Sequence, residues 1–278
     1  LLSYPFPQSA ISSSTRFRGG DATLRTVPLI LLLLIFSGNA FADEGSGFRD
    51  PVDFLRKTLV DLRAGPGYLA YENIRRYGRE VTGSHNGADL LYDLRIGPVN
   101  ITNIFDQAGF TRGKKFRMGL LVNYTGDEYE AAGLSKRKKR IFGGGFVGYN
   151  WLTLYFRSDL TGKNAGLLYN AHFAPRLLSI GKSSEFFLVL DVEHMNRPYV
   201  EYYFGIRPWE ATALLPSYRG KRSTNYSANL LYVWKITKRL DFTFWGGEKR
   251  FGKGVTRSPT VGLKHQYRAG VGLLFEFL

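Results

Sequence analysis

Side chains that could carry out acid–base or metal chemistry are few and scattered in this sequence. The chain has no cysteine and four histidines, which are His85, His172, His194 and His265. No two of them stand at the H-x-H or H-x-x-x-H spacing that lets two side chains share a metal ion. His85 is at the centre of GSHNG, where a nucleophile elbow would need a serine. We therefore predict a protein without a catalytic residue, a metal ion or a cofactor.

A run of adjacent cations is the densest charged segment of the chain. It lies in SKRKKR and comprises Lys136, Arg137, Lys138, Lys139 and Arg140. Such side chains form charge-assisted contacts with the phosphates of lipopolysaccharide or with cell-wall carboxylates. A solvated loop that aids solubility is the alternative interpretation. The run is a candidate contact for an anionic surface.

A second candidate site lies between residues 203 and 218, where aromatic, proline and arginine residues gather. These residue types are enriched where one protein binds another. The candidate partner-binding residues are Tyr203, Phe204, Arg207, Trp209, Leu215, Pro216 and Tyr218. The alternative is that they belong to a membrane-interface girdle and to a loop folded over the mouth of a barrel.

The elements that position these residues are predicted to be strands, because apolar side chains recur at every second residue. At the carboxyl end, one set is almost wholly apolar: Tyr267, Ala269, Val271, Leu273, Phe275 and Phe277. The intervening set is mostly small or charged: Arg268, Gly270, Gly272, Leu274 and Glu276. A period of two indicates a strand whose faces meet different environments. In a membrane barrel, the apolar row faces lipid and the other row faces a polar interior.

The same period indicates further strands along the chain. Clear alternation marks 116–124, 152–159, 167–173, 226–234 and 240–244, and weaker patterns mark 60–71, 89–96, 99–105, 142–149, 186–194 and 199–205. Most have the length that a tilted membrane strand requires. Short turns at 150, 181–183 and 235–239 would share one side, which would make 195–222 a single long loop without a strand. In that case 199–205 is loop, or a strand before residue 116 is missing from this count. Ten and twelve strands both remain open.

The amino-terminal segment has the pattern of a secretory signal peptide. Arginines precede the apolar run 27–36, and Ala40-Phe41-Ala42 follows as a small-x-small cleavage site. We predict a signal peptide over 1–42 with an over-extended start. A periplasmic lead-in over 43–59 follows, with a possible short helix capped by Asp50 and begun by Pro51. The barrel spans 60–278.

Composition agrees with export to a membrane. Aromatic residues make up 15% of the chain, glycine occurs 32 times, and the formal net charge is +15. An exported cationic chain meets lipid headgroups, lipopolysaccharide and the cell wall, so we predict no nucleic-acid partner. We predict an all-β fold, a single transmembrane antiparallel β-barrel of about 10–12 strands, in the outer membrane of a Gram-negative bacterium.

Motifs in the second half of the chain resemble those of the MipA/OmpV family of outer-membrane proteins. The motifs are Tyr203-Phe204-Gly205-Ile206-Arg207-Pro208, then Leu215-Pro216-Ser217-Tyr218, and later Ser258-Pro259-Thr260-Val261. The resemblance implies an outer-membrane barrel that acts as a scaffold for a lytic transglycosylase and a bifunctional penicillin-binding protein. Other members of the family are adhesion or antigenic surface proteins.

We therefore expect a non-catalytic scaffold for murein synthesis and hydrolysis enzymes. One alternative is a passive channel, because the inward rows, which include Arg157 and Arg268, are polar and the positive net charge would favour anions. The other alternative is a surface adhesion protein.

Overall fold

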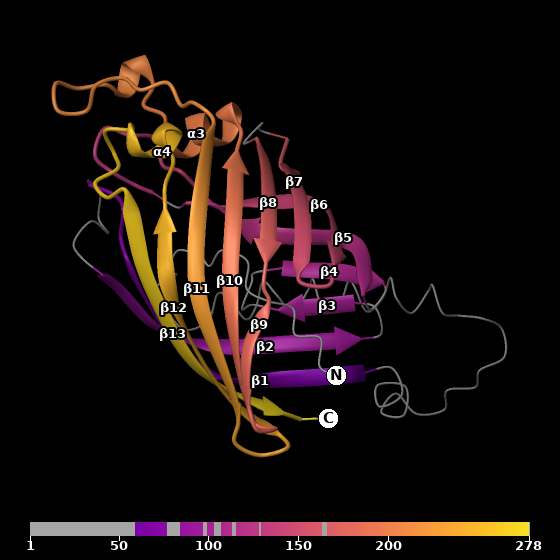
Figure 1. Ribbon diagram of the computed structural model, residues 1–278. Coiled ribbons are helices and arrows are strands. Elements are labelled where there is room, and N and C mark those ends of the chain that lie inside the picture. The colour runs from indigo at the N-terminus through magenta and orange to yellow at the C-terminus, as the bar shows by residue number, and fades with distance from the viewer. Residues whose placement is uncertain are drawn as a thin grey trace, which may run out of the picture. The chain divides into compact units, whose positions relative to one another are not determined.

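The structure is a computed structural model that describes residues 59–76, 84–96, 99–102, 107–112, 115–127, 129–162 and 166–277. Within these ranges, thirteen strands form one sheet, and every pairing with a defined register is antiparallel (Figure 1). The helices among the described residues are all too short or too polar to cross a membrane.

The bounds of the elements follow the chain. The first strands are β1 (Leu59–Glu72), β2 (Ser84–Ile96), β3 (Val99–Thr102), β4 (Gln107–Arg112), β5 (Phe116–Thr125), β6 (Arg140–Tyr149) and β7 (Leu152–Asp159). The others are β8 (Leu167–Phe173), β9 (Arg176–Ile180), β10 (Ser184–Met195), β11 (Ser223–Lys235), β12 (Leu240–Arg250) and β13 (His265–Glu276). Three short helices accompany them: α3 (Arg197–Phe204), η1 (Pro208–Glu210) and α4 (Lys253–Thr256).

Neighbouring strands in the sheet are mostly neighbours in the sequence. The order is β11-β12-β13-β1-β2-β3-β4-β5-β6-β7-β8-β10-β9, and β10 also pairs with β11 at the other end of this order. β8 pairs with the second half of β10, and β9 pairs with its first half. Ala174 and Pro175 separate β8 from β9, and proline has no N–H to give to the ladder. β8 and β9 are therefore two halves of one interrupted strand.

The two faces of the sheet have the polarity of a membrane barrel. On one face, called the outer face, β5 exposes Phe116, Met118, Leu120, Val122 and Tyr124, while Leu121 and Asn123 on the opposite, inner face are buried. β13 repeats the pattern, with exposed Tyr267, Val271, Leu273 and Phe275 and buried Gln266 and Arg268. Exposed apolar rows and buried polar rows invert the arrangement of a soluble sheet. The predicted all-β barrel architecture and the predicted direction of its two faces are confirmed.

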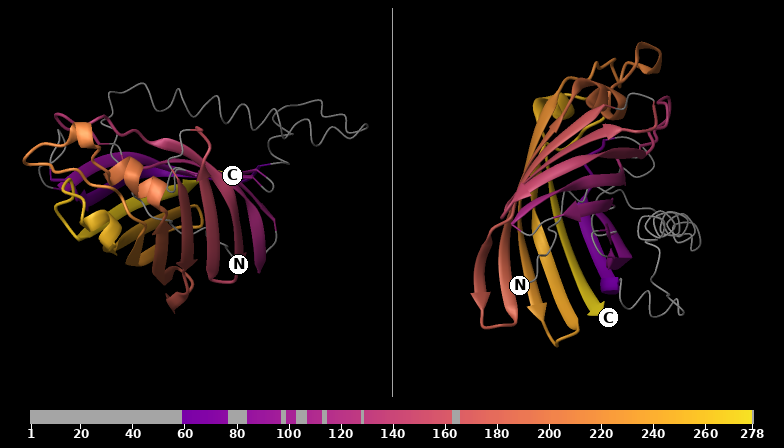
Figure 2. Two further views of the ribbon diagram at one scale, coloured as in Figure 1. Left: turned by 90° about the horizontal axis from the view of Figure 1, so that it is seen from above. Right: turned by 90° about the vertical axis from the view of Figure 1, so that its right-hand side faces the viewer.

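The connections differ in length at the two ends of the strands. Short turns join β6 to β7, β9 to β10 and β11 to β12, and we call this end, where β13 also finishes, the short-turn end. The segments 126–139, 196–222 and 251–264 lie at the opposite, long-loop end, with α3 and α4 (Figures 1 and 2). The turns predicted to share one side do so, and 195–222 is a long connection as that arrangement required.

Two predicted elements need correction. The predicted strand 199–205 is the helix α3, because Asn196 caps it by accepting the Tyr199 N–H at 3.1 Å and Pro198 lies in its first turn. The strand missing before residue 116 is β4, whose sequence QAGFTR lacks an alternating apolar row. The segment 199–205 is therefore not a strand, and the predicted count was also one strand short before residue 116.

Three predictions lie outside the described residues. The signal peptide over 1–42 is one, and the lead-in with its possible helix is another, except that β1 already begins at Leu59. His85 lies in β2, but its side chain is outside what the structure describes.

Candidate functional site at the long-loop end

The helix α3 covers the long-loop end of the sheet with apolar side chains. Tyr199, Val200, Tyr203 and Phe204 are its buried residues. They pack into one cluster with residues from β6, β8, β10 and the 251–264 segment: Phe142, Leu168, Met195, Phe251, Val255 and Val261, together with Ile74. Gly126 has a positive φ of 122°, and a Cβ there would lie 2.1 Å from the Tyr203 hydroxyl oxygen. The bare glycine therefore lets the Tyr203 ring close over this end.

Arg75 ties four segments together beneath α3. Its guanidinium donates to the Asp127 carboxylate at 2.7 Å, to the Thr260 hydroxyl at 2.6 Å and to the Tyr203 carbonyl at 2.8 Å. The same group lies 4.4 Å from the Tyr129 ring centre and 4.3 Å from that of Phe204. A buried cation held by a carboxylate and two rings joins the loops into one rigid cover.

A buried ion pair braces the loop that carries η1. Arg137 donates to the Glu210 carboxylate at 3.0 Å and to the Gly205 carbonyl at 3.1 Å. Glu210 also accepts the backbone N–H groups of Ser135 and Arg207, each at 3.0 Å. Burial acts to raise the pKa of Glu210, but the hydrogen bonds from Arg137, Ser135 and Arg207 outweigh it and lower this pKa to about 2. Glu210 is therefore an anion at physiological pH.

The candidate partner-binding residues divide between the cover and the surface. Tyr203, Phe204 and Leu215 are buried, and the half-buried Tyr218 donates its hydroxyl to the Gly254 carbonyl at 2.7 Å. Arg207 and Pro216 are exposed, and Trp209 is 75% exposed. Leu214, which the sequence did not single out, is 80% exposed. Partner binding by this segment stays a prediction, and the surface it would use consists of Arg207, Trp209, Leu214 and Pro216.

The basic run is also divided. Arg137 is the buried brace described above, and Arg140 stacks over the Tyr202 ring at 4.1 Å and lies 3.8 Å from the Asp159 carboxylate. Lys136 pairs with Glu130 at 2.9 Å, Lys139 lies 5.8 Å from the Tyr124 ring centre, and Lys138 is exposed. The run is therefore less available to an anionic surface than its sequence suggests, and that contact stays a prediction.

Charged and polar side chains fill the inner face below the cover. Lys249 lies 2.6 Å from the Glu193 carboxylate, which also accepts from Asn225 at 3.0 Å. His172 lies 2.7 Å from Asp191, which accepts the Ser227 hydroxyl at 3.1 Å. Arg157 bonds to Asn170, and Arg268 donates to Asn229 at 3.1 Å. Arg157 and Arg268 thus lie on the inner face, as their rows predicted.

Ser227 and His172 of this network do not form a serine–histidine pair. The hydroxyl of Ser227 donates to Asp191 and not to His172, so histidine is not placed to take its proton. In the ranges that the structure describes, no group of three or more histidine, cysteine, aspartate or glutamate residues could hold a metal ion. The pairing within the network is not visible in the sequence, although Glu193 and Lys249 lie on the inner rows of their strands.

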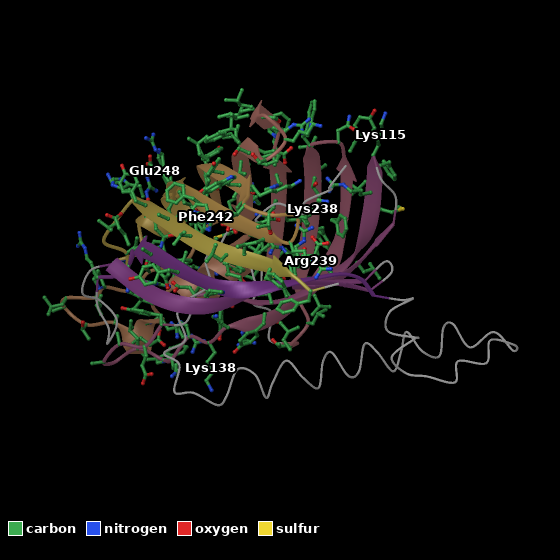
Figure 3. All side chains as sticks on the ribbon, turned by 90° about the horizontal axis from the view of Figure 1, so that it is seen from below. Lys115, Lys138, Lys238, Arg239, Phe242 and Glu248 are labelled. Atoms are coloured by element: carbon green, nitrogen blue, oxygen red, sulfur yellow. The ribbon has the colours of Figure 1, made fainter. Side chains whose placement is uncertain are left out.

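A smaller ionic group lies on the inner face at the short-turn end. Arg63 of β1 donates to Asp241 at 2.9 Å and to Glu276 at 3.1 Å. The exposed cations of this end include Lys182 in the β9–β10 turn and Lys238 and Arg239 in the β11–β12 turn, of which the last two are labelled in Figure 3.

A family model and two relatives match this chain over most of its length. The family model described as MltA-interacting protein MipA matches residues 77–277. Outer membrane protein Omp26La of Vibrio anguillarum is 23% identical over 249 residues, which cover 87% of this chain and 91% of that protein. Outer membrane protein OmpV of Vibrio cholerae is 22% identical over 248 residues, with the same two coverages. A solved structure of Pseudomonas putida OprB aligns at a TM-score of 0.37 and 8% identity, covering 81% of this chain and 96% of that one.

The family model spans well over half of the chain, across the described strands from β2 to β13. The inverted polarity of the sheet and the names of the two relatives agree with a place in the outer membrane. The chain belongs to the MipA family of outer-membrane proteins.

Proposed function

We propose that this protein is a non-catalytic outer-membrane scaffold that holds a lytic transglycosylase, and with it a penicillin-binding protein, at the periplasmic surface of the membrane. The description of its family as MltA-interacting supports the first partner. The observation that carries the proposal is the state of the interior. On the described inner face Lys249 contacts Glu193 and His172 contacts Asp191, and α3 covers the long-loop end, so we look for the partner contact on the outer surfaces of the turns and loops.

The orientation of the strands decides which surface a periplasmic enzyme would meet. Bacterial barrels place short turns in the periplasm and longer loops outside the cell. The segment with Trp209 lies at the long-loop end, away from a periplasmic partner. We therefore assign the scaffold contact to the short-turn end, where Lys182 is exposed. Lys238 and Arg239 are exposed at the same end (Figure 3). Their charge suits an acidic patch on the enzyme.

The test compares two variants of the tagged, full-length protein purified from crosslinked cell envelopes. The first variant reverses charge at the short turns, with Lys182→Glu, Lys238→Glu and Arg239→Glu. The matched control truncates the opposite end, with Trp209→Ala and Leu214→Ala. Mass spectrometry should find a lytic transglycosylase with the wild type and the control, and its recovery should fall at least about tenfold with the first variant.

Two results would contradict this proposal. Recovery of the barrel alone from wild-type envelopes would remove the scaffold function. Loss of the enzyme with the Trp209 and Leu214 variant only would transfer the contact to the long-loop end and refute the orientation. Each variant must also show the barrel's shift in gel mobility on boiling, so that a folding failure is recognised.

A second candidate function is adhesion at the cell surface. It is favoured by Trp209 and Leu214, which are 75% and 80% exposed on a loop braced by Arg137 and Glu210. Large apolar side chains held in a fixed position are typical binding anchors. Cells that display the Trp209→Ala and Leu214→Ala variant would then attach to a surface less well than wild-type cells at equal display.

A further inference from the structure

A basic pocket lies where α3 begins, on the outer face of the sheet. Its volume is about 700 Å³, and four cations line it: Arg197, Arg219, Lys221 and Arg222. The rings of Tyr169 and His194 complete the wall. Tyr169 comes from β8 and His194 from β10, and both belong to the outer rows of these strands. Neither the basic run at 136–140 nor the exposed loop residues around Trp209 take part in this pocket.

Gly220 allows the segment with Arg219, Lys221 and Arg222 to lie beside Arg197. Its N–H donates to the Glu201 carboxylate in α3. A Cβ at this position would lie 2.4 Å from the Glu201 backbone nitrogen and 2.7 Å from the Val200 carbonyl carbon. The absence of a side chain therefore lets the segment 219–222 lie directly on α3, and Arg219 and Lys221 join Arg197 in one pocket.

Hydrogen bonds also fix the side of the pocket that is formed by α3, β8 and β10. Asn196 caps α3 and also accepts the Leu167 N–H at 2.9 Å, which attaches the helix to the start of β8. The Nδ1 atom of His194 lies 2.9 Å from the Thr224 hydroxyl oxygen, so the ring is fixed on its own strand pair. The β8–β10 side of the pocket is thus built from secondary structure, whereas Arg219, Lys221 and Arg222 lie in an irregular segment docked on α3.

The four cations differ from three arginines of the same end in having no anionic partner. Arg75, Arg137 and Arg140 each lie against a carboxylate. Within the described part of the chain, the side chains of Arg197, Arg219, Lys221 and Arg222 form no ion pair and no hydrogen bond. Glu201 touches the same segment, but its carboxylate accepts the Gly220 N–H. Four like charges around one cavity repel one another, and a bound anion would offset that repulsion.

The position of the pocket indicates what kind of anion it meets. Along β10 the outer row continues from His194 to the exposed Val192 and Leu190, and Val192 pairs across to the exposed Tyr226 of β11. Tyrosines at this level are typical of the boundary between acyl chains and headgroups. A ligand with its charged group in the pocket would lay apolar chains along Val192 and Tyr226. Arginine and lysine side chains bind phosphate strongly, through bidentate and point-charge contacts respectively.

We propose that this pocket binds a phosphate group carried by a lipid of the adjacent leaflet, the phosphorylated glycolipid of the outer leaflet. Inorganic phosphate shares the recognised chemistry, so the experiment has to separate the two sources.

The experiment uses the full chain in a mild detergent and native mass spectrometry. Three probes are added separately: phosphorylated lipid A, the same lipid after removal of its phosphates, and inorganic phosphate. The pocket variant carries Arg197→Gln, Arg219→Gln, Lys221→Gln and Arg222→Gln. The matched control removes four exposed cations from the same end of the protein, with Arg250→Gln, Lys253→Gln, Arg257→Gln and Lys264→Gln.

The wild type and the control should retain phosphorylated lipid A, and the pocket variant should bind it at least about tenfold more weakly, since each basic residue near a membrane adds to the attraction. Binding should also weaken as salt concentration rises. Equal retention of the dephosphorylated lipid would overturn the proposal, as would an equal loss in both variants. Inorganic phosphate that binds as tightly as the lipid would overturn the lipid as the source. A gel-mobility shift on boiling shows that each variant is folded.

Discussion

At the scale of single residues, Arg137 shows that the surroundings of a charged side chain decide whether it braces the fold or remains on the surface. In the sequence it is one of five cations in a row. In the structure its side chain is 4% exposed and pairs with Glu210, whose side chain is 2% exposed. Its neighbour Lys136 is exposed and pairs with Glu130. Two adjacent cations therefore have different functions, one internal and one on the surface.

The pair makes a prediction about loop stability. Arg137→Gln leaves the Glu210 carboxylate buried without its cation, which costs about 3 kcal/mol. The 205–219 loop should open, and trypsin should cleave after Arg219 at least about tenfold faster. Lys136→Gln, which breaks an exposed pair worth less than about 1 kcal/mol, is the control and should leave the cleavage rate unchanged. Equal cleavage of the wild type and Arg137→Gln would show that the pair does not hold the loop.

The same pair predicts a dependence on pH. The folded pKa of Glu210 is about 2 and its ordinary value is 4.5. Because the folded pKa is the lower one, the ionised group stabilises the loop above about pH 4.5, and this stabilisation is lost as pH falls toward 2. Hydrogen exchange of 205–219, corrected for the intrinsic effect of pH, should therefore rise between pH 5 and pH 2. In Glu210→Gln it should be raised at both pH values and show little further change.

At the scale of elements, the docking of one segment on α3 depends on a single glycine. A methyl group at Gly220 would meet the backbone of Val200 and Glu201 and would displace the segment 219–222. We expect Gly220→Ala to expose part of α3 and to speed hydrogen exchange in 197–204. Gly133→Ala is a suitable comparison for a glycine in open space, although its φ of 80° adds some strain of its own. Faster exchange in 197–204 with the Gly133 variant alone would contradict the docking role of Gly220.

At the scale of the whole molecule, the covered long-loop end and the paired inner face predict an electrically silent barrel. The apolar cluster around Tyr203 lies at the long-loop end, and Glu193, Lys249 and Asn225 contact one another on the inner face, so we expect them to hinder the passage of ions. The purified protein in a planar bilayer should give no stepwise conductance. Regular steps with anion preference, reduced by Arg157→Gln or Arg268→Gln, would instead establish the channel.

The sequence by itself determined the class of the fold, because side-chain direction in a strand alternates with every residue and the apolar rows are therefore visible without coordinates. It also predicted that the short turns share one end of the strands and that Arg157 and Arg268 lie on the inward-facing rows. Only the tertiary structure decided that Arg197–Phe204 is a helix, because its cap Asn196 and its apolar partners Phe142 and Val255 come from outside the segment. The burial of Arg137 and the basic pocket beside Gly220 likewise depend on loops that are distant in sequence and meet only when the strands are assembled. No local sequence pattern therefore predicts them.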